Sequence, residues 1–561
     1  DTFGKLTTEV YNDRSALAII LDGKVISAPG VREGPILGGR CEISGSFTES
    51  QVRNLASALE NPLQTPVMIE EERSAAPSLG QDSINSGLKS GIYGTIATLI
   101  IVLLYYRFAG LVANFALVIN TIILLGAMVM FGSVLTLPGI AGMILTLGMA
   151  IDANVLIYER LREEMAEGKS LKASINAAYD KAFSAIFDSN VTTLITAGIL
   201  FWKATGPVKG FAVTLTLGII ASLFTALVVT RNLFSWAIHL GWLKKITMTN
   251  MIKPTKIDFL GKRRLALSFS GLIIAAAIGI FAVRGEKNFG VDFKGGDRLV
   301  LSAQNKPSDG DVRSAIENLK IGDVVVQTEK GSKGEFITVR GPKGTGDQIA
   351  AHLTTTMPDA GFKKEQMESV GSVVGGELAF NSVLALALGM LGILIYVSLR
   401  FEFSFAIGAL VALLHDVIIT VGIFSLMGRE LSLVIVGAVL TIAGYSVNDT
   451  IVVFDRIREN IASGRRGAVA DIMNQAINET LSRTVLTGGV TLLTTLILFL
   501  FGGPVLGDFA ATILIGVLVG TYSSIYVAAP IVLWWSGKSG ETLRREIEES
   551  HAQDQQARAT A

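Results

Sequence analysis

Long apolar runs alternate with short polar connections along most of the chain. A membrane-crossing helix needs about 20 mostly apolar residues, and eleven segments meet this requirement. They lie near residues 87–105, 111–131, 139–158, 186–202, 211–232, 265–283, 378–399, 405–427, 432–454, 484–502 and 509–535. Only 17% of the 561 residues are charged, against about 25% in a soluble protein. The pattern predicts a polytopic α-helical membrane protein.

Lysine and arginine gather in every second connection between these runs, most densely in 231–264 and 456–483. Such residues mark cytoplasmic loops, so residues 1–86 and 284–376 are expected on the outer side of the membrane. A polar segment there needs an export signal or a preceding span. Because the sequence begins at Asp1 with neither, we expect an N-terminal truncation that removes at least one span, with six spans in each half of the complete protein.

The chain contains an internal repeat at an offset of about 296 residues. "GMAIDANVLIYERLREE" from Gly148 parallels "GYSVNDTIVVFDRIREN" from Gly444, and "GPVKGFA" (206–212) parallels "GPVLGDFA" (503–510). Both copies have the same orientation by the charge rule. Parallel repeats imply a pseudo-two-fold axis along the membrane normal, with the functional site at the repeat interface.

The two outer segments are predicted to be small α+β domains. Residues 284–376 give the order β-α-β-β-α-β of a ferredoxin-like fold, with Ser308 and Asp311 forming a capping box at the first helix. Residues 1–86 offer strands in "SALAIILDG" and "CEISGSF" and a helix that Thr48 opens, and are interpreted as the remaining part of a larger domain. The other expected segments are a five-span first half (87–240), a basic linker (241–264), the first span of the second half (265–283), a five-span bundle (377–536) and a disordered cytoplasmic tail (537–561).

Two carboxylates, Asp152 and Asp449, stand inside the apolar runs of the repeat. A charge at the bilayer centre costs at least about 2.5–3.5 kcal/mol and usually marks an ion pathway. Arg483 occurs only once, because its counterpart in the first half is Ala185. A guanidinium stays charged, so its approach keeps a carboxylate ionised and its departure lets the acid take a proton. This combination predicts a proton-driven switch.

The two acids are not equivalent in the repeat. Asp152 aligns with Asn448, one position away from Asp449, and one position on a helix is about 100° of rotation. The carboxylates therefore need not be symmetric across the interface. Structural alternatives stay open: either acid could be a hydrogen-bonding residue near a helix end, and Arg483 could be an arginine that snorkels to the membrane surface.

Other polar residues in the spans are candidates for supporting roles, among them Asn154 and Asn448. Asp188 lies near the cytoplasmic end of its span and could simply cap the helix or meet solvent. His415 and Asp416 are adjacent and are expected to point to different helix faces, with a proton relay and a structural hydrogen bond as equal alternatives.

The charged tails of the repeat motifs, around Arg160 and Arg456, are interpreted as interfacial anchors with inside-positive charge.

The sequence offers no motif for chemical catalysis or for a cofactor. It has no "GxxxxGK[ST]" for nucleotide binding, and its four histidines are scattered. A net charge of zero gives no electrostatic argument for nucleic-acid binding. We therefore expect a protein that is not an enzyme, holds no metal or cofactor, and takes its energy from an ion gradient.

Several motifs resemble the SecD/SecF family of protein-export membrane proteins, which is related to the RND transporters. "LDGKVISAPGV", "EEERSAAPSLGQDSI" and "GMAIDANVLIYERLREE" are similar to SecD motifs, and "NFGVDFKGGDRL", "GYSVNDTIVVFDRIREN" and "LSRTVLTGG" to SecF motifs. They follow one another as in a fused SecD–SecF chain, and the resemblance leads us to expect a further span and much of the first outer domain before Asp1.

The resemblance implies an accessory component of the Sec translocon in the bacterial cytoplasmic membrane that uses the proton-motive force to help secretory proteins across. It implies Asp152, Asp449 and Arg483 as the proton pathway, with H⁺ or Na⁺ as coupling ion. The implied partners are SecYEG, with YajC and YidC, and unfolded secretory polypeptides. Two other classes stay open, an RND-type small-molecule exporter and a non-transporting membrane scaffold. The exporter would need outer domains of about 300 residues, far longer than 284–376.

Overall fold

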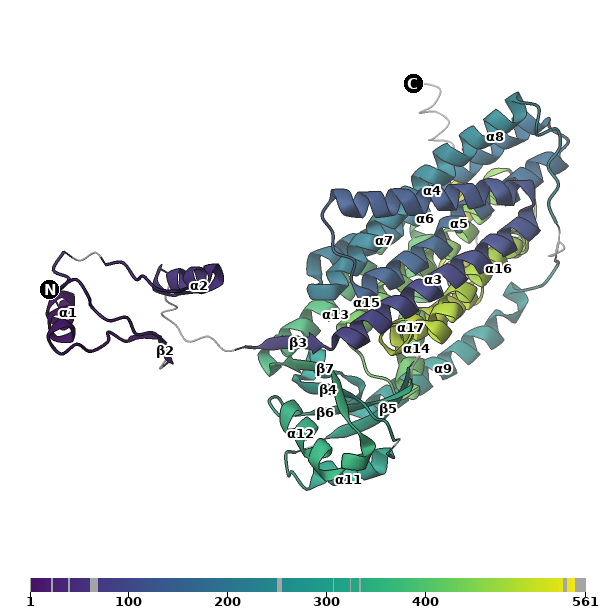
Figure 1. Cartoon of the computed structure of the whole chain (residues 1–561). Helices are drawn as coiled ribbons and strands as arrows, with labels where there is room; N and C mark the ends of the chain where they lie inside the picture. The colour runs from purple at the N-terminus through teal and green to yellow at the C-terminus, as the bar shows by residue number, and fades with distance from the viewer. Residues whose placement is uncertain are drawn as a thin grey trace. The chain divides into compact units, whose positions relative to one another are not determined.

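The computed structural model of the chain describes residues 2–21, 24–38, 41–60, 69–249, 255–305, 307–322, 324–331, 334–537 and 542–549. The chain divides into two compact units, Asp1–Ile69 and Glu70–Ala561 (Figure 1). The first unit contains helices α1 (Thr2–Asn12) and α2 (Glu49–Glu60) and a hairpin of β1 (Ile19–Leu21) and β2 (Lys24–Ser27).

The predicted cap of α2 is confirmed, because the backbone N–H of Thr48 donates to Gln51 Oε1 at 2.9 Å. The strand predicted in "CEISGSF" is wrong. Residues 41–47 are irregular, and no described strand lies beside them to pair with their backbone groups.

The expected domain boundary at residue 86 is also wrong. Strand β3 (Glu71–Ala75) belongs to the second unit, where it pairs antiparallel with β7 (Lys363–Val370). Helix α3 (Pro77–Tyr106) then begins two residues after β3 ends. The chain therefore enters the membrane directly from the edge strand of a sheet that residues near 300–370 build.

This sheet confirms the predicted β-α-β-β-α-β order. It has five antiparallel strands in the order β3-β7-β4-β6-β5. The remaining strands and helices of the domain are β4 (Gly296–Ser302), α11 (Asp309–Glu317), β5 (Val325–Gly331), β6 (Gly334–Gly341) and α12 (Gly346–Thr356). The capping box of Ser308 and Asp311 at α11 is present as predicted.

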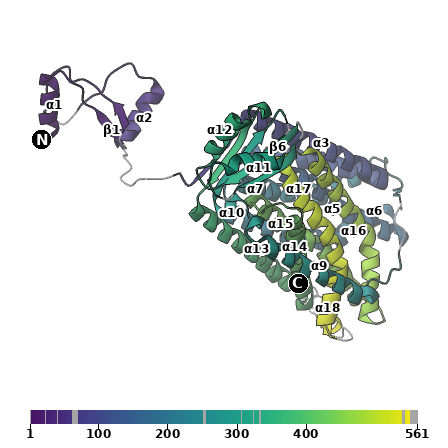
Figure 2. The same ribbon diagram turned by 90° about the horizontal axis from the view of Figure 1, so that it is seen from below.

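The two faces of the sheet have different neighbours, because successive side chains of a strand point to opposite faces. Leu299, Leu301 and Val339 pack in an apolar core with α11 and α12, which cover the face turned away from the helical bundle in Figures 1 and 2. Arg298 and Arg340 point the other way. They line a cavity of about 1370 Å³ between the sheet and the bundle.

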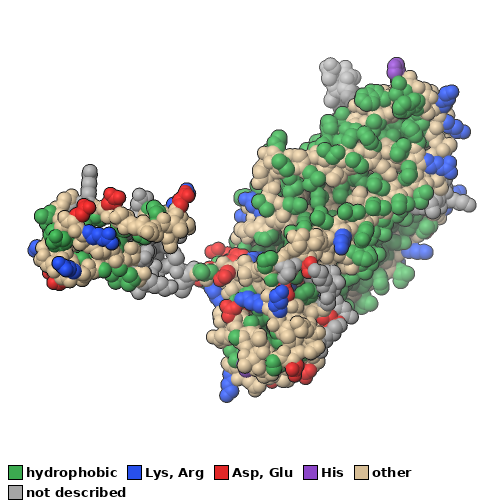
Figure 3. Space-filling model, in the orientation of Figure 1, with side chains coloured by type: hydrophobic (Ala, Val, Ile, Leu, Met, Phe, Trp, Pro, Cys, Tyr) green, Lys and Arg blue, Asp and Glu red, His purple; other side chains and the backbone are tan. Residues whose placement is uncertain are grey.

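All eleven predicted spans are helices long and apolar enough to cross a membrane. They begin with α3 and continue as α4 (Phe108–Met130), α5 (Leu137–Ala166), α6 (Leu171–Lys203), α7 (Gly206–Phe224) joined to α8 (Thr230–His239), α9 (Arg263–Arg284), α13 (Ser372–Arg400), α14 (Phe403–Leu426), α15 (Leu433–Ala462), α16 (Val469–Phe501) and α17 (Pro504–Ser523) joined to α18 (Ala529–Trp535). Hydrophobic side chains cover the visible face of this bundle in Figure 3, and lysines and arginines gather at its end far from the sheet. We call the two ends the sheet end and the basic end.

The helices reproduce the sequence repeat. A π-helical turn joins α7 to α8 at Thr225–Val229, and another joins α17 to α18 at Ser524–Ala528. Helices of one half pack against helices of the other, α5 against α16 and α15 against α6. Two glycines allow this close approach. A Cβ on Gly148 would lie 2.8 Å from Thr494 Oγ1, and a Cβ on Gly444 would lie 2.5 Å from Thr196 Oγ1.

The tail is not wholly disordered, contrary to the prediction for 537–561. Residues 542–549 form a helix whose Leu543 and Ile547 are fully buried in the apolar core of the second half. Their spacing of four residues places both side chains on one helix face. Residues 550–561 lie outside the described residues.

Candidate functional site: a buried ion pair between the halves

Asp152 of α5 and Arg483 of α16 form an ion pair that joins the two halves. Arg483 Nη2 donates to Asp152 Oδ1 at 2.7 Å, and the side chains are 4% and 14% exposed. The arginine points inward and is buried, so it does not snorkel to the membrane surface. The approach of Arg483 to an intramembrane acid, predicted from the sequence, is found with Asp152, although 331 positions separate the two residues.

Asp449 of α15 lies beside this pair. It is 4% exposed and close enough to Arg483 and Asp152 to interact electrostatically with both. Among the described residues we find no hydrogen bond to its carboxylate. The predicted asymmetry of the two acids is thus visible in the geometry: one carboxylate holds the single cation, and the other faces it without a direct bond.

Two further polar atoms of Arg483 define the chemistry of the site. Its Nε and Nη1 are buried and have no hydrogen-bond partner among the described residues. Buried donors are normally satisfied, so this guanidinium has spare capacity for a second carboxylate or for water. A move from Asp152 toward Asp449 would use that capacity.

Asn448, the repeat counterpart of Asp152, fastens α15 to α6. With its amide nitrogen oriented to donate, it hydrogen-bonds the carbonyl oxygens of Ser189 (2.6 Å) and Gly444 (3.1 Å). Asn154 is also buried, and its nitrogen reaches only the Ala150 carbonyl oxygen of its own helix, at 3.4 Å. The Asn448 side chain therefore makes a hydrogen bond to the other half, whereas the Asn154 side chain makes no such bond to the described residues.

Tyr445 is a residue that the sequence reading missed. It lies one turn before Asp449 on α15, is 6% exposed, and donates to Thr491 Oγ1 at 3.0 Å. A tyrosine in an apolar run carries no distinctive signal by itself. Its position four residues from an intramembrane acid is the one feature that could have singled it out.

Asp188 is neither a helix cap nor solvated. It is 2% exposed and lies on α6, where it accepts hydrogen bonds from Arg400 Nε at 2.7 Å and from the Tyr396 hydroxyl at 2.8 Å. Both partners are on α13. Asp188 therefore forms a second ion pair between the halves, nearer the basic end.

The sequence predicted that His415 and Asp416 point to different helix faces, but the structure shows their side chains in contact. His415 Nδ1 lies 2.8 Å from Asp416 Oδ1, and both side chains are buried. Asp416 also accepts hydrogen bonds from Ser446 of α15 and from Ser523 of α17, the latter at 2.7 Å. This cluster lies within the second half and joins three of its helices.

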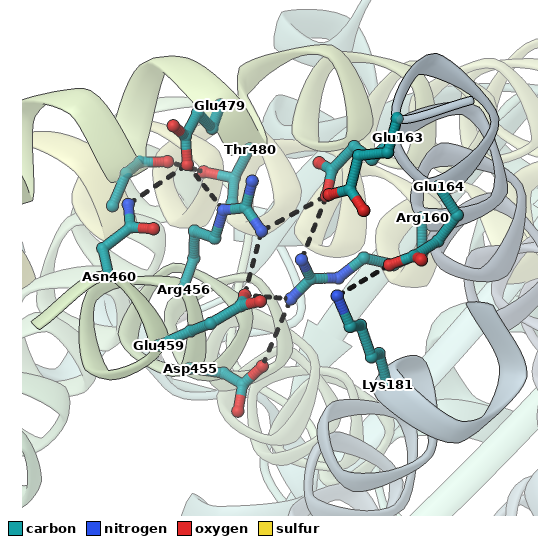
Figure 4. Close-up of polar contacts among 12 residues, drawn as sticks. Arg160, Glu163, Glu164, Lys181, Asp455, Arg456, Glu459, Asn460, Glu479 and Thr480 are labelled. Atoms are coloured by element: carbon teal, nitrogen blue, oxygen red, sulfur yellow. Dashed lines mark hydrogen bonds and ion pairs between the residues drawn. The ribbon is translucent and has the colours of Figure 1, made fainter. Parts of the chain in front are cut away.

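The charged tails around Arg160 and Arg456 are more than interfacial anchors. Arg160 contacts Glu163 on its own helix and Glu459 on α15, and Arg456 contacts Glu459 on its own helix and Glu163 on α5 (Figure 4). The two tails therefore bind each other across the repeat axis, which the positive-inside interpretation did not foresee.

In the part of the chain that the structure describes, no three His, Cys, Asp or Glu side chains are grouped to hold a metal ion. The site consists of a buried guanidinium, one carboxylate bonded to it and a second carboxylate beside it.

Comparisons with known proteins agree with the motifs. The family model "Protein export membrane protein SecD/SecF, C-terminal" matches residues 56–239 and 349–538, and the model "SecDF, P1 head subdomain" matches residues 1–63. The chain is 34% identical over 538 residues to the protein translocase subunit SecDF of Brucella abortus, covering 94% of this chain and 71% of the relative. It is 37% identical over 539 residues to that of Thermus thermophilus, covering 93% and 71%.

Solved structures give the same result. The crystal structure of SecDF from Thermus thermophilus, described as a translocon-associated membrane protein, matches with a TM-score of 0.81 at 37% identity, over 95% of this chain and 73% of that one. A crystal structure of SecDF in a super-membrane-facing form matches with a TM-score of 0.70 at 36% identity, over 98% and 74%. The chain belongs to the SecD/SecF family of protein export membrane proteins.

Proposed function

We propose that the chain works as an accessory component of the Sec translocon, using the proton-motive force to promote late translocation of secretory proteins across the bacterial cytoplasmic membrane. The relatives of this chain are named protein translocase subunits, which supports the role in Sec-dependent export. The observation that carries the ion-driven part is the position of Asp449, a buried carboxylate beside a single guanidinium that another carboxylate already holds.

The proposed cycle moves Arg483 between the two acids. While Asp449 carries a proton it is neutral, and Arg483 stays with Asp152. When Asp449 loses the proton, a second buried anion faces the guanidinium, which is drawn toward α15 because an unpaired buried charge is costly. The membrane potential adds about 2.3 kcal/mol per charge per 100 mV. H⁺ is the proposed coupling ion, and Na⁺ is the alternative.

Movement of α15 would reach the outer domain through Asp292. Its Oδ2 accepts from the backbone N–H of Leu433, at the start of α15, at 2.9 Å, and its Oδ1 accepts from Arg73 of β3 at 2.8 Å. The helix that carries Asp449 is thus tied by one carboxylate to the edge strand of the sheet.

The proposed orientation follows the charge rule. The basic end faces the cytoplasm, and the sheet and residues 1–69 are on the outer side, where a translocating polypeptide emerges. The proposed partners are SecYEG, with YajC and YidC, and unfolded secretory polypeptides.

The test is Asp449→Asn in the full-length protein, with export of a secretory precursor and drug tolerance measured in parallel. We expect a stably inserted variant that accumulates precursor and keeps normal drug tolerance. Asp471→Asn is the matched control, since it makes the same change at an exposed position of α16. Normal export by the Asp449 variant would refute the proposal, and raised drug sensitivity alone would favour a small-molecule exporter.

The coupling ion is tested separately in vesicles that contain the translocon. Export activity of the full-length protein is compared at fixed membrane potential with and without Na⁺ and with and without a pH gradient. Dependence on the pH gradient alone is expected; dependence on Na⁺ alone would replace H⁺ by Na⁺ in the cycle.

A further inference from the structure

Four side chains at the basic end form a closed ring of alternating charge. Arg160 lies 3.1 Å from Glu163, Glu163 lies 3.2 Å from Arg456, Arg456 lies 2.9 Å from Glu459, and Glu459 lies 2.5 Å from Arg160. Each arginine contacts both glutamates, as Figure 4 shows. We call this set the arginine–glutamate ring.

The ring follows the repeat symmetry. Arg160 and Arg456 are equivalent positions of α5 and α15, and so are Glu163 and Glu459. Each ion pair within one helix is therefore matched by the same pair in the other, and each cross-helix pair likewise. A symmetric ring can form only while the basic ends of α5 and α15 lie side by side, so it reports directly on the relative position of the two halves.

Three of the ring residues line a small cavity that leads to the site. The cavity has a volume of about 30 Å³ and is lined from α5, α6, α15 and α16. The ring residues Arg160, Glu163 and Arg456 form one part of its wall, and Arg483 forms another. It therefore occupies the space between the charged tails and the guanidinium that holds Asp152.

This cavity has the properties of a site for water. A water molecule needs at least about 10–15 Å³ and polar partners, and the cavity offers both. The charged side chains of Arg160, Glu163 and Arg483 form part of its wall and supply the polar atoms.

The glutamates of the ring lie near solvent, which makes the ring easier to open than a fully buried ion pair. The arginines are 10% and 13% exposed, whereas the glutamates Glu163 and Glu459 are 40% and 37% exposed. Carboxylates at the edge of solvent are rehydrated when an ion pair breaks, so the cost of opening is smaller than for a fully buried pair. Arg456 also has a partner outside the ring, Glu479, at 2.6 Å, and this contact can remain when the ring opens.

We propose that the arginine–glutamate ring is the gate at the basic end of the ion pathway, and that the cavity behind it holds the water that carries the ion between Arg483 and the cytoplasm. The ring is closed in this structure. It opens when α5 and α15 separate at their basic ends, which connects the cavity to solvent. The direction of ion flow in this inference rests on the function proposed above, but the gate itself is tested without it.

The test measures access to the cavity. Ala185, which lines it and is 2% exposed, is replaced by cysteine in full-length protein whose other cysteines, Cys41 included, are replaced by alanine. A membrane-impermeant methanethiosulfonate reagent is added to the basic side in inside-out vesicles. With the ring intact, we expect slow modification of the new cysteine.

The ring is then broken by Glu163→Gln with Glu459→Gln, and we expect modification to become several-fold faster. Glu167→Gln with Asp471→Asn is the matched control, because it removes two exposed carboxylates at the basic ends of α5 and α16, and should leave the rate slow. Equal rates in the ring-intact and ring-broken proteins would overturn the gate. If the double variant does not insert, each single Gln variant replaces it, with the same two outcomes at a smaller rate difference.

A last arm separates the gate from the proposed function. An imposed pH gradient should change the modification rate in the ring-intact protein, and adding Asp449→Asn should abolish that change. A gradient response that survives Asp449→Asn would refute the role of Asp449 in the proposed function. It would also overturn the proposed link between protonation of Asp449 and opening of the ring, whatever rate the ring-broken protein shows.

Discussion

Asp292 joins two elements that the sequence separates by long intervals, and its contribution can be estimated from its contacts. One carboxylate oxygen accepts from Arg73 Nη2 at 2.8 Å, and the other accepts from the backbone N–H of Leu433 at 2.9 Å. The side chains of Asp292 and Arg73 are 7% and 27% exposed. Replacing Asp292 by asparagine keeps the shape, but it leaves an NH₂ group facing one of two donors.

The expected cost has two parts. A hydrogen bond to a charged group contributes about 1.5–3 kcal/mol, and a carboxylate at a helix N-terminus about 0.3–1 kcal/mol. Only the bond to Arg73 breaks when β3 opens, so we expect Asp292→Asn to lower the free energy of opening of β3 by about 1.5–3 kcal/mol. The coupling energy between Asp292 and Arg73, from the cycle with Arg73→Gln, should be about 2 kcal/mol, because the contact with Leu433 cancels in the cycle.

The assay is hydrogen–deuterium exchange of Glu71–Ala75 in the full-length protein in detergent, since exchange of these paired amides reports local opening of the strand. Glu70 and Lys343 provide a matched control cycle. They also tie this segment to the sheet domain, at 3.0 Å, but their side chains are 38% and 40% exposed, so their coupling should be about 0–1 kcal/mol. Equal coupling in the two cycles, or unchanged exchange in Asp292→Asn, would refute the reasoning.

Three further predictions use the same kind of reasoning, each read from the thermal unfolding of the purified protein. Gly444→Ala should be destabilising by about 1–3 kcal/mol, because a Cβ there meets the backbone of α6 at 3.0 Å, whereas Gly489→Ala on α16 meets nothing within 4 Å and should be neutral; equal effects would contradict this. Arg400→Ala leaves Asp188 buried and without its cation, and should cost about 3–5 kcal/mol, much of it regained in the double variant with Asp188→Ala; no regain would show that the charge is not the cause. Burial raises the pKa of Glu402 above its usual value of 4.5, so the folded protein holds the carboxyl proton more tightly than the unfolded chain does. The stability that this proton contributes is complete below the usual pKa and is lost as pH rises through the raised pKa. Glu402→Gln should therefore raise the unfolding midpoint near pH 7 and not below about pH 4; an equal gain at both would contradict the titration.

The membrane helices and the intramembrane ion pair were predictable from the sequence for a physical reason. A helix that spans the bilayer needs a long apolar run, and a charge inside such a run is costly enough to stand out. Asp152, Asp449 and Arg483 each break a run, and the repeat places them near one another at the interface. The ferredoxin-like order was readable because its strands and helices have distinct periodicities and its first helix has an explicit cap.

The edge strand β3 was not predictable in the same way. Its residues, Glu71–Ala75, are exposed and show no apolar alternation, and they join the sheet through backbone pairing with residues about 300 positions away. Backbone pairing leaves no trace in side-chain pattern. The ordered helix 542–549 was missed because only Leu543 and Ile547 mark its buried face, which is too little signal in a polar tail.

The arginine–glutamate ring had a signal that the charge rule obscured. The tails around Arg160 and Arg456 were interpreted as interfacial anchors with inside-positive charge, and this interpretation gives no role to the acids beside the arginines. Yet both tails carry arginine and glutamate three residues apart in equivalent positions of the repeat. A two-fold axis between the helices brings equivalent positions together, so like charges would face each other unless each arginine found the partner's glutamate.

Symmetry is thus kept in the contacts that join the two halves and is broken at the site of Asp152, Asp449 and Arg483. The ring at the basic end consists of equivalent arginine–glutamate pairs, and the glycine–threonine contacts of Gly148 and Gly444 repeat in each half. At the centre, Arg483 is equivalent to Ala185 in the repeat, and the two acids differ by one position in the repeat alignment. A fully symmetric centre would present two equal cation sites and give no net direction. In the proposed cycle, a single cation between unequal acids would make the two halves respond differently to one protonation, and the symmetric frame would convert that difference into a relative movement of α5 and α15.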